Sequence, residues 1–361
     1  MLIKEIILEA KQTPLKHGST RGHMGEYLLG SALVAKMING EGGVSMADVK
    51  AVMDQTSATD KLTSTFSGKE GDEIFFKNVI KNQKNIRDAR DVDALVDAMS
   101  EELAGAVKFA NSDIYSRKWS KIFSENGRPD KILVKAAGEE DQKGTKADIF
   151  LIYILPNGKE RIIKGWSLKT DSNLIGQASP RTFENMQVFF NLMGIQLDPI
   201  DNYEQDPAGH VVSIMKQVEN DINRLTVGDD TDKEVQLVDT ITGFMADQLT
   251  KNDPRVYIVN LGRGDYTAQT ISKMRRNLEN VDLEATLSLS GRPSLYVHEK
   301  GNMKDFLFMI RYSYNPPRTG SDGKTRPERH KLIVEKGPLF KKLATISADD
   351  VDKETADPSV I

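Results

Sequence analysis

The chain has 361 residues, of which 39% are hydrophobic and 28% are charged, and its formal net charge is −4. These proportions are typical of a globular protein, and no apolar run approaches the roughly 18–20 residues that a membrane helix requires. The absence of cysteine excludes disulfides, thiolate metal sites and cysteine nucleophiles. We therefore expect a cytoplasmic protein, in a bacterial or phage setting, with no membrane partner.

The first third of the chain is expected to be mainly helical. Apolar residues recur at helical spacing within residues 19–38, and Ser45 is a suitable N-cap for a second helix. Residues 72–110 continue the helical pattern. We interpret residues 1–127 as a helical N-terminal part that contributes a helix to the core.

After Gly127 the pattern changes to short apolar runs separated by turns. In chain order it predicts strands at 131–136, 148–155 and 161–169, a helix at 180–193, two helices within 210–250, a strand at 255–261, a helix at 267–278, strands at 281–289, 294–298 and 304–314, a loop at 315–327 and a strand at 330–335. We therefore expect an α/β core with a mixed central sheet in residues 128–345. Residues 346–361 are expected to form an acidic, disordered tail.

The strands at 148–155 and 161–169 are expected to form a hairpin with polar residues at one end. Asp148 opens an otherwise apolar strand, and Ser167 and Lys169 are two residues apart on the next strand, so both point to the same face. Leu168 points into the core, but its carbonyl remains available. A carboxylate and an amine at a sheet edge suit Mg²⁺-dependent hydrolysis of a phosphodiester. A plain surface ion pair explains the same two residues.

These residues resemble the PD-(D/E)XK nuclease superfamily, the fold of type II restriction endonucleases. The resemblance covers mainly residues 128–195 and implies a restriction-endonuclease-like core, Mg²⁺ as cofactor and double-stranded DNA as partner. It also implies that Asp148 binds the metal with the Leu168 carbonyl, that Lys169 positions the attacking water, and that Ser167 hydrogen-bonds water or phosphate. A homodimer would suit the cutting of both DNA strands, and a nicking monomer fits equally.

One position departs from this family, because Ser167 stands where most members carry Asp or Glu. A hydroxyl is a poor metal ligand, so a second acid is expected from elsewhere. Glu26, on the N-terminal helix beside His23, is our preferred candidate. Glu184, on the helix after the hairpin, is the alternative, and Asp171 is a third.

Positive charge gathers near the C-terminus, where residues 311–342 hold nine Lys and Arg against three acids. The Gly- and Pro-containing loop in this region is expected to contact DNA, either at base edges or at phosphates, and a solvated surface loop is the other interpretation. The candidate DNA-binding residues are Gln177, Arg318, Lys324, Arg326 and Arg329.

The sequence therefore predicts a metal-dependent DNA endonuclease, restriction-like or from a phage or mobile element. A non-catalytic DNA-binding or phage assembly protein that retains the fold is the alternative.

Overall fold

The structure is a computed structural model. It describes residues 18–59, 63–69, 71–78, 91–127, 129–136, 146–170, 173–226, 231–253, 255–319 and 324–353. No helix among these residues is long and apolar enough to cross a membrane.

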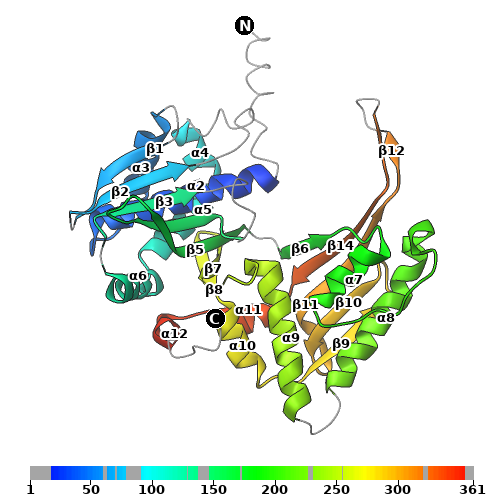
Figure 1. The fold of residues 1–361 in the computed structure, drawn as a ribbon. Coiled ribbons are helices and arrows are strands. Elements are labelled where there is room, and N and C mark those ends of the chain that lie inside the picture. The colour runs from blue at the N-terminus through cyan, green and yellow to red at the C-terminus, as the bar shows by residue number, and fades with distance from the viewer. Residues whose placement is uncertain are drawn as a thin grey trace. The chain divides into compact units, whose positions relative to one another are not determined.

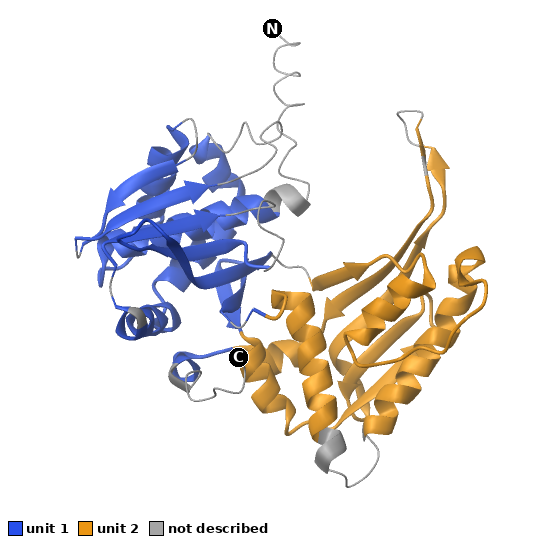
Figure 2. Cartoon of the chain, viewed as in Figure 1, with its two compact units in different colours: residues 1–171, 253–269, 346–361 blue, residues 172–252, 270–345 orange. Residues whose placement is uncertain are grey.

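The chain folds into two compact units, which Figure 2 shows in different colours. Unit 1 comprises residues 1–171, 253–269 and 346–361, and unit 2 comprises residues 172–252 and 270–345. Neither unit is one continuous stretch, because the chain leaves unit 1 after the hairpin and returns to it twice. This division differs from the expected boundary after residue 127.

Unit 1 contains a mixed seven-stranded sheet in the order β1-β2-β3-β4-β5-β7-β8 (Figure 1). The pairs β2/β3 and β5/β7 are parallel, and the other neighbouring pairs are antiparallel. The strands are β1 (Thr63–Ser67), β2 (Glu73–Asn78), β3 (Lys131–Ala136), β4 (Ile149–Ile154), β5 (Glu160–Thr170), β7 (Val256–Gly262) and β8 (Asp265–Gln269). The expected α/β class with a mixed sheet is thus confirmed, as is the hairpin of β4 and β5.

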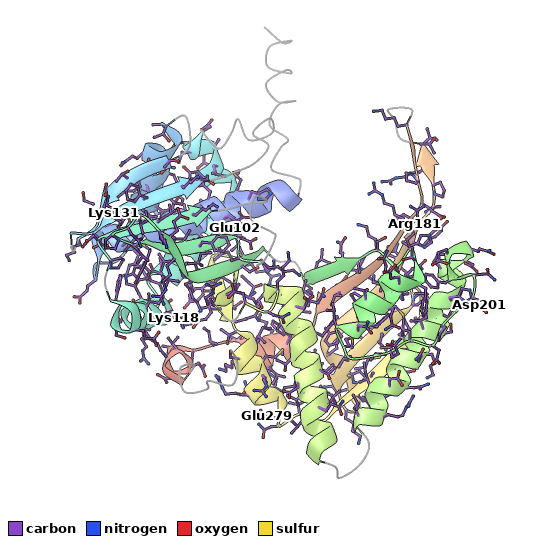
Figure 3. The ribbon with its side chains drawn as sticks, in the orientation of Figure 1. Glu102, Lys118, Lys131, Arg181, Asp201 and Glu279 are labelled. Atoms are coloured by element: carbon purple, nitrogen blue, oxygen red, sulfur yellow. The ribbon has the colours of Figure 1, made fainter. Side chains whose placement is uncertain are left out.

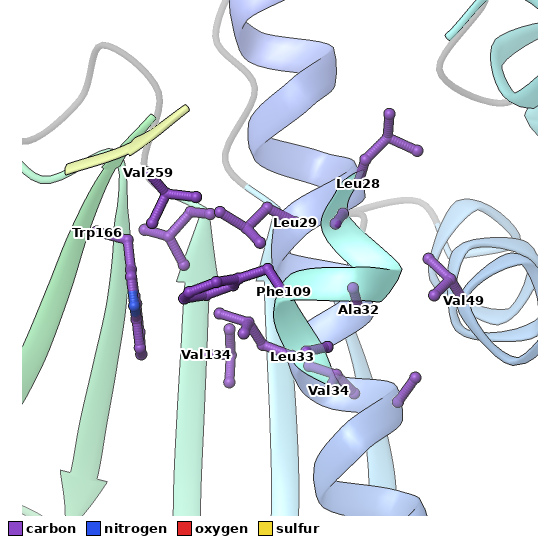
Figure 4. Close-up of a cluster of buried hydrophobic side chains, with 14 of the residues drawn as sticks. Leu28, Leu29, Ala32, Leu33, Val34, Val49, Phe109, Val134, Trp166 and Val259 are labelled. Atoms are coloured by element: carbon purple, nitrogen blue, oxygen red, sulfur yellow. The ribbon is translucent and has the colours of Figure 1, made fainter. Parts of the chain in front are cut away.

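The core of unit 1 is built around its first described helix, α2 (Gly18–Asn39). Leu28, Leu29 and Leu33 of this helix are fully buried, and Figure 4 shows them between strand residues on one side and α3 on the other. A helix buried on most of its circumference needs apolar residues nearly all round, which this sequence supplies. The helices of unit 1 are α2, α3 (Met46–Ser57), α4 (Val92–Ala98), α5 (Ser100–Ala110), α6 (Asp113–Asn126) and α12 (Ala348–Lys353).

Unit 2 contains a five-stranded antiparallel sheet in the order β6-β14-β11-β10-β9. Its strands are β6 (Leu174–Ala178), β9 (Leu283–Ser288), β10 (Ser294–Glu299), β11 (Asn302–Asn315) and β14 (Arg329–Lys336). Its helices are α7 (Phe183–Asn191), η3 (Tyr203–Gln205), α8 (Pro207–Thr226), α9 (Thr231–Thr250), α10 (Ile271–Leu278) and α11 (Pro338–Ala344).

A two-stranded arm extends from this sheet, where the sequence predicts only a loop. The pairing of β11 with β14 reaches Asn315 opposite Arg329, and the ribbon continues as β12 (Arg318–Thr319) paired with β13 (Thr325–Arg326). Figure 1 shows this ribbon leaving the body of the sheet. The prediction of a loop was wrong in part, because residues 318–319 and 325–326 pair as short strands between the flanking prolines.

Two predicted helices were also wrong in part. Residues 73–78, expected to be helical, form β2, in which Ile74, Phe76 and Asn78 are buried and alternate with more exposed residues. Residues 265–269 form β8, and the helix expected from residue 267 begins only at Ile271. In β2 the alternation of burial has a period of two, which is the period of a strand, whereas β8 is recognised by its antiparallel pairing with β7.

The expected disordered tail is ordered in its first part. Residues 348–353 form α12, where Val351 is fully buried. Arg117 of α6 donates a hydrogen bond to Asp349 Oδ1 at 2.9 Å, and Lys121 Nζ donates to the Val351 carbonyl at 3.1 Å. The acidic residues here therefore meet basic residues of α6 within unit 1. Residues 354–361 of the expected tail lie outside the described residues.

A close approach between α5 and the turn before β8 predicts a stability effect. A Cβ atom at Gly105 would lie 2.4 Å from the backbone carbonyl oxygen of Asp265. We expect Gly105→Ala to lower the free energy of unfolding by about 1–3 kcal/mol in urea titrations, because backbone must shift to admit the methyl group. Gly22→Ala, which meets no heavy atom within 4 Å in helix α2, is the control and is expected to be neutral or stabilising. An equal loss in both variants would contradict this explanation.

Candidate active site

Asp148 lies directly before β4 and completes the end of the β4/β5 ladder. Its backbone N–H donates to the Trp166 carbonyl at 2.8 Å, and its Oδ2 accepts from the Leu168 backbone N–H at 2.6 Å. The Ser167 hydroxyl donates to the same Oδ2 at 3.3 Å. Ile149 pairs with Trp166 in the hairpin register, which places Asp148 and Ser167 next to each other at the hairpin end.

Lys169 lies two residues beyond Ser167 on β5 and points to the same face of the sheet. Its positive charge lowers the pKa of Asp148, so the two side chains interact electrostatically. In the sheet register Lys169 is opposite Asn260 of β7. Asn260 Nδ2 donates to Thr267 Oγ1 at 3.1 Å and to Gln269 Oε1 at 3.0 Å. Polar side chains thus continue from β5 across β7 to β8.

Helix α2 supplies two more ionisable groups to this part of unit 1. His23 Nδ1 and Glu26 Oε1 are 3.2 Å apart, and Glu26 is 6% exposed. The charge of His23 also lowers the pKa of Asp148, which places the first turns of α2 within electrostatic reach of the hairpin end. Since α2 packs against β5, the burial of its apolar residues carries Glu26 below the surface.

Burial nevertheless raises the pKa of Asp148 above its usual range. This desolvation outweighs the opposing effects of Lys169, of the two hydrogen bonds from β5 and of His23. The carboxylate is therefore held in a position where its charged form is disfavoured by the protein alone. A carboxyl group with a raised pKa beside a lysine is a common feature of functional sites.

The donor groups for a metal ion are limited. No group of three or more His, Asp or Glu side chains is placed to hold a metal in the part of the chain that the structure describes. Asp148 at the hairpin end and Glu26 on α2 are the candidate carboxylates, and the N–H of Leu168 points to Asp148. The carbonyl of a strand residue points to the same side as its N–H, so the Leu168 carbonyl faces the same way. Mg²⁺ is often held by one or two carboxylates and several waters, and this donor set fits it.

The other candidate residues lie elsewhere in the chain. Glu184 is in the first turn of α7 in unit 2, where it is exposed, whereas Glu26 is a buried acid of α2 in unit 1. Asp171 lies outside the described residues.

The five candidate DNA-binding residues all belong to unit 2. Gln177 is on the edge strand β6, Arg318 and Arg326 are on the arm, and Lys324 directly precedes β13. Arg329 opens β14. Within unit 2 they lie along the edge strand β6, the arm and the start of β14.

Sequence analysis missed several polar residues that adjoin these positions. Asn260 has no motif around it and is recognised only from its register with Lys169. Arg181, His330 and Lys331 line a groove with Gln177 and Arg329. The excess of positive charge in residues 311–342 is the one sequence signal that points toward His330 and Lys331.

No protein-family model, no curated protein and no solved structure in our comparisons matches this chain. The functional interpretation therefore depends on the geometry of the site itself.

Proposed function

We propose that this chain is a metal-dependent DNA endonuclease with a restriction-endonuclease-like core in unit 1. The observation that carries this proposal is the end of the β4/β5 hairpin. There a carboxylate withdrawn from water, Asp148, lies beside Ser167 and within electrostatic reach of Lys169 and of His23 on α2. The mixed sheet and the meander of β3, β4 and β5 are compatible with the core that the sequence resembles.

Asp148 and Glu26 would hold Mg²⁺, with the Leu168 carbonyl and water as further oxygen donors. The ion would supply positive charge next to a phosphate and thereby assist phosphodiester hydrolysis. Lys169 would orient the attacking water and stabilise negative charge on the phosphate. Ser167 would keep Asp148 in place through its hydroxyl, as it does in the structure.

The direct test is incubation of supercoiled double-stranded plasmid with the protein in Mg²⁺ and, in parallel, in EDTA. We expect nicked or linear plasmid only with Mg²⁺. Cleavage in EDTA would exclude the metal-dependent mechanism. The ratio of nicked to linear product would show whether a homodimer that cuts both strands or a nicking monomer is at work.

The choice between the two helix acids gives a further prediction. We expect Glu26→Gln to reduce the cleavage rate on the order of a hundredfold, because it removes the buried carboxylate proposed as the second metal ligand without changing the size of the side chain. Glu184→Gln is the matched control, and its exposed side chain in unit 2 should leave the rate within about threefold of wild type. Plasmid cleavage at equal protein concentrations measures both, and the reverse ranking would assign the second acid to Glu184.

A non-catalytic DNA-binding protein, which includes a phage assembly protein that retains the fold, is the second candidate. It is favoured by the hydrogen bond from the Leu168 N–H, since Asp148 also satisfies the end of a β-ladder and so has a structural explanation. Tight DNA binding with no cleavage under any divalent cation would select this candidate.

A further inference from the structure

A groove of about 480 Å³ opens in unit 2 at the base of the arm. One wall is the end of β6 and the segment after it, from Gln177 to Arg181, and the other wall is residues 327–331 at the start of β14. Figure 3 labels Arg181 near the base of the arm, between the ribbon and α7. We call this feature the arm-base groove.

Positive charge predominates in the arm-base groove. Arg181 and Arg329 are exposed, and neither guanidinium forms an ion pair with any residue that the structure describes. Lys331 Nζ donates a hydrogen bond to Gln177 Oε1 at 3.0 Å, which ties the two walls together. Glu328 is the one acid among the lining residues that the structure describes. Two unpaired guanidinium groups in a concave surface are a favourable arrangement for phosphate oxygens.

His330 gives a second and independent indication of a ligand. It is 5% exposed and lines the groove, and its Nδ1 lies 2.6 Å from the Tyr312 hydroxyl. Burial raises the pKa of Tyr312 to about 12, so this hydroxyl keeps its proton. We assign this hydroxyl as the donor to Nδ1, which leaves a ring proton on Nε2.

That Nε2–H group has no hydrogen-bond partner among the described residues. The nearest carboxylate oxygen, Glu328 Oε1, is 3.5 Å away without hydrogen-bond geometry, and the other oxygen of Glu328 accepts from the Tyr314 hydroxyl at 3.2 Å. A buried donor without an acceptor costs roughly 1–3 kcal/mol. An anion in the groove would satisfy this donor.

We infer that the arm-base groove binds backbone phosphates of double-stranded DNA, with Arg181, Arg329 and Lys331 as the cationic contacts and His330 as a further hydrogen-bond donor. The choice of DNA as the source of the phosphate rests on the proposed function. The arm that rises beside the groove is a two-stranded ribbon, an element that the major groove of DNA admits. Contacts at its base would then fix the position of the ribbon on the duplex.

The test is fluorescence anisotropy of a labelled short DNA duplex in EDTA, so that no cleavage occurs. We expect the double substitution Arg181→Ala and Arg329→Ala to weaken binding on the order of tenfold or more at ~0.1 M salt. It should also reduce the slope of log affinity against log salt by about two. The control is the double substitution Arg224→Ala and Lys304→Ala, which removes the same charge from α8 and β11 outside the groove and should change binding little.

Glu328→Gln provides a test of opposite sign. Removal of this acid, the one carboxylate among the described lining residues, should tighten binding several-fold, because a carboxylate repels a phosphate at this position. Weaker binding in this variant, or equal loss in the groove and control variants, would overturn the inference. Preference for a single-stranded competitor over the duplex would overturn it as well.

The outcomes separate this inference from the proposed function. Groove-dependent duplex binding in a protein that never cleaves DNA would support the groove and reject the endonuclease. Mg²⁺-dependent cleavage by a protein whose groove variant binds as the wild type does would do the reverse.

Discussion

Lys169→Ala is expected to abolish cleavage of plasmid DNA while leaving duplex binding unchanged. Lys169 lies on the face of β5 that carries Ser167, and its charge acts on the Asp148 carboxylate. Loss of a positioned acid–base group costs typically 10²–10⁴-fold in rate, and loss of electrostatic stabilisation adds to it. We therefore expect a decrease at the upper end of that range.

The matched control for this substitution is Lys159→Ala. Lys159 is an exposed lysine at the turn end of the same hairpin, so its removal changes the net charge equally but leaves the site intact. Plasmid cleavage in Mg²⁺ and duplex binding in EDTA should be measured for both variants. Full cleavage by the Lys169→Ala protein would reject the proposed mechanism, and an equal fall in both variants would show a non-specific charge effect.

Asp148→Asn is expected to abolish cleavage and, at the same time, to preserve or raise the thermal midpoint of the metal-free protein. Burial raises the pKa of Asp148 in the folded state above its unfolded value of about 4. The ionised form therefore disfavours folding, and its contribution lowers the free energy of unfolding as pH rises from the unfolded pKa through the folded one. Asparagine carries no charge and retains an oxygen for the Leu168 N–H, so this pH dependence should disappear.

Mg²⁺ should reverse the order of thermal stability of the wild-type and Asp148→Asn proteins. A cation that binds only the folded state stabilises it by about 2.7 kcal/mol at a concentration of 100 Kd. The wild-type thermal midpoint should therefore rise with Mg²⁺, whereas that of Asp148→Asn should not. Thermal melts across pH, with and without Mg²⁺, measure both effects. If Asp148 only completes the β-ladder, Mg²⁺ will shift neither protein.

The Asp148 hairpin could be predicted from sequence because its signals are local. An apolar strand, the turn at Pro156-Asn157-Gly158 and the spacing of Ser167 and Lys169 set the register of two adjacent strands. The same local reasoning failed at residues 73–78 and at the arm. Residues 73–78 pair with β3, which is distant in sequence and which a propensity pattern does not contain. The arm pairs residues close in sequence, but its Pro and Gly content obscures the strand signal.

The pairing of His23 with Glu26 follows from their spacing on one helix. The position of this helix relative to the hairpin does not follow from sequence. Sequence left two alternatives: Glu26, which we preferred because the resemblance implies an acid on the N-terminal helix, and Glu184 on the helix after the hairpin. Only the burial of α2 against β5 brought His23 into electrostatic reach of Asp148, and only the division into two units placed Glu184 on the exposed surface of unit 2.

The sequence by itself therefore determined the α/β class, the hairpin and the residues Asp148, Ser167 and Lys169 at its end. The tertiary structure alone decided the burial of Glu26 on α2, the raised pKa of Asp148 and the groove that joins Gln177 to Lys331. The physical reason is the distance along the chain over which each interaction acts. Strand alternation and turns are set by neighbouring residues, whereas desolvation and the meeting of distant strands depend on how the whole chain packs.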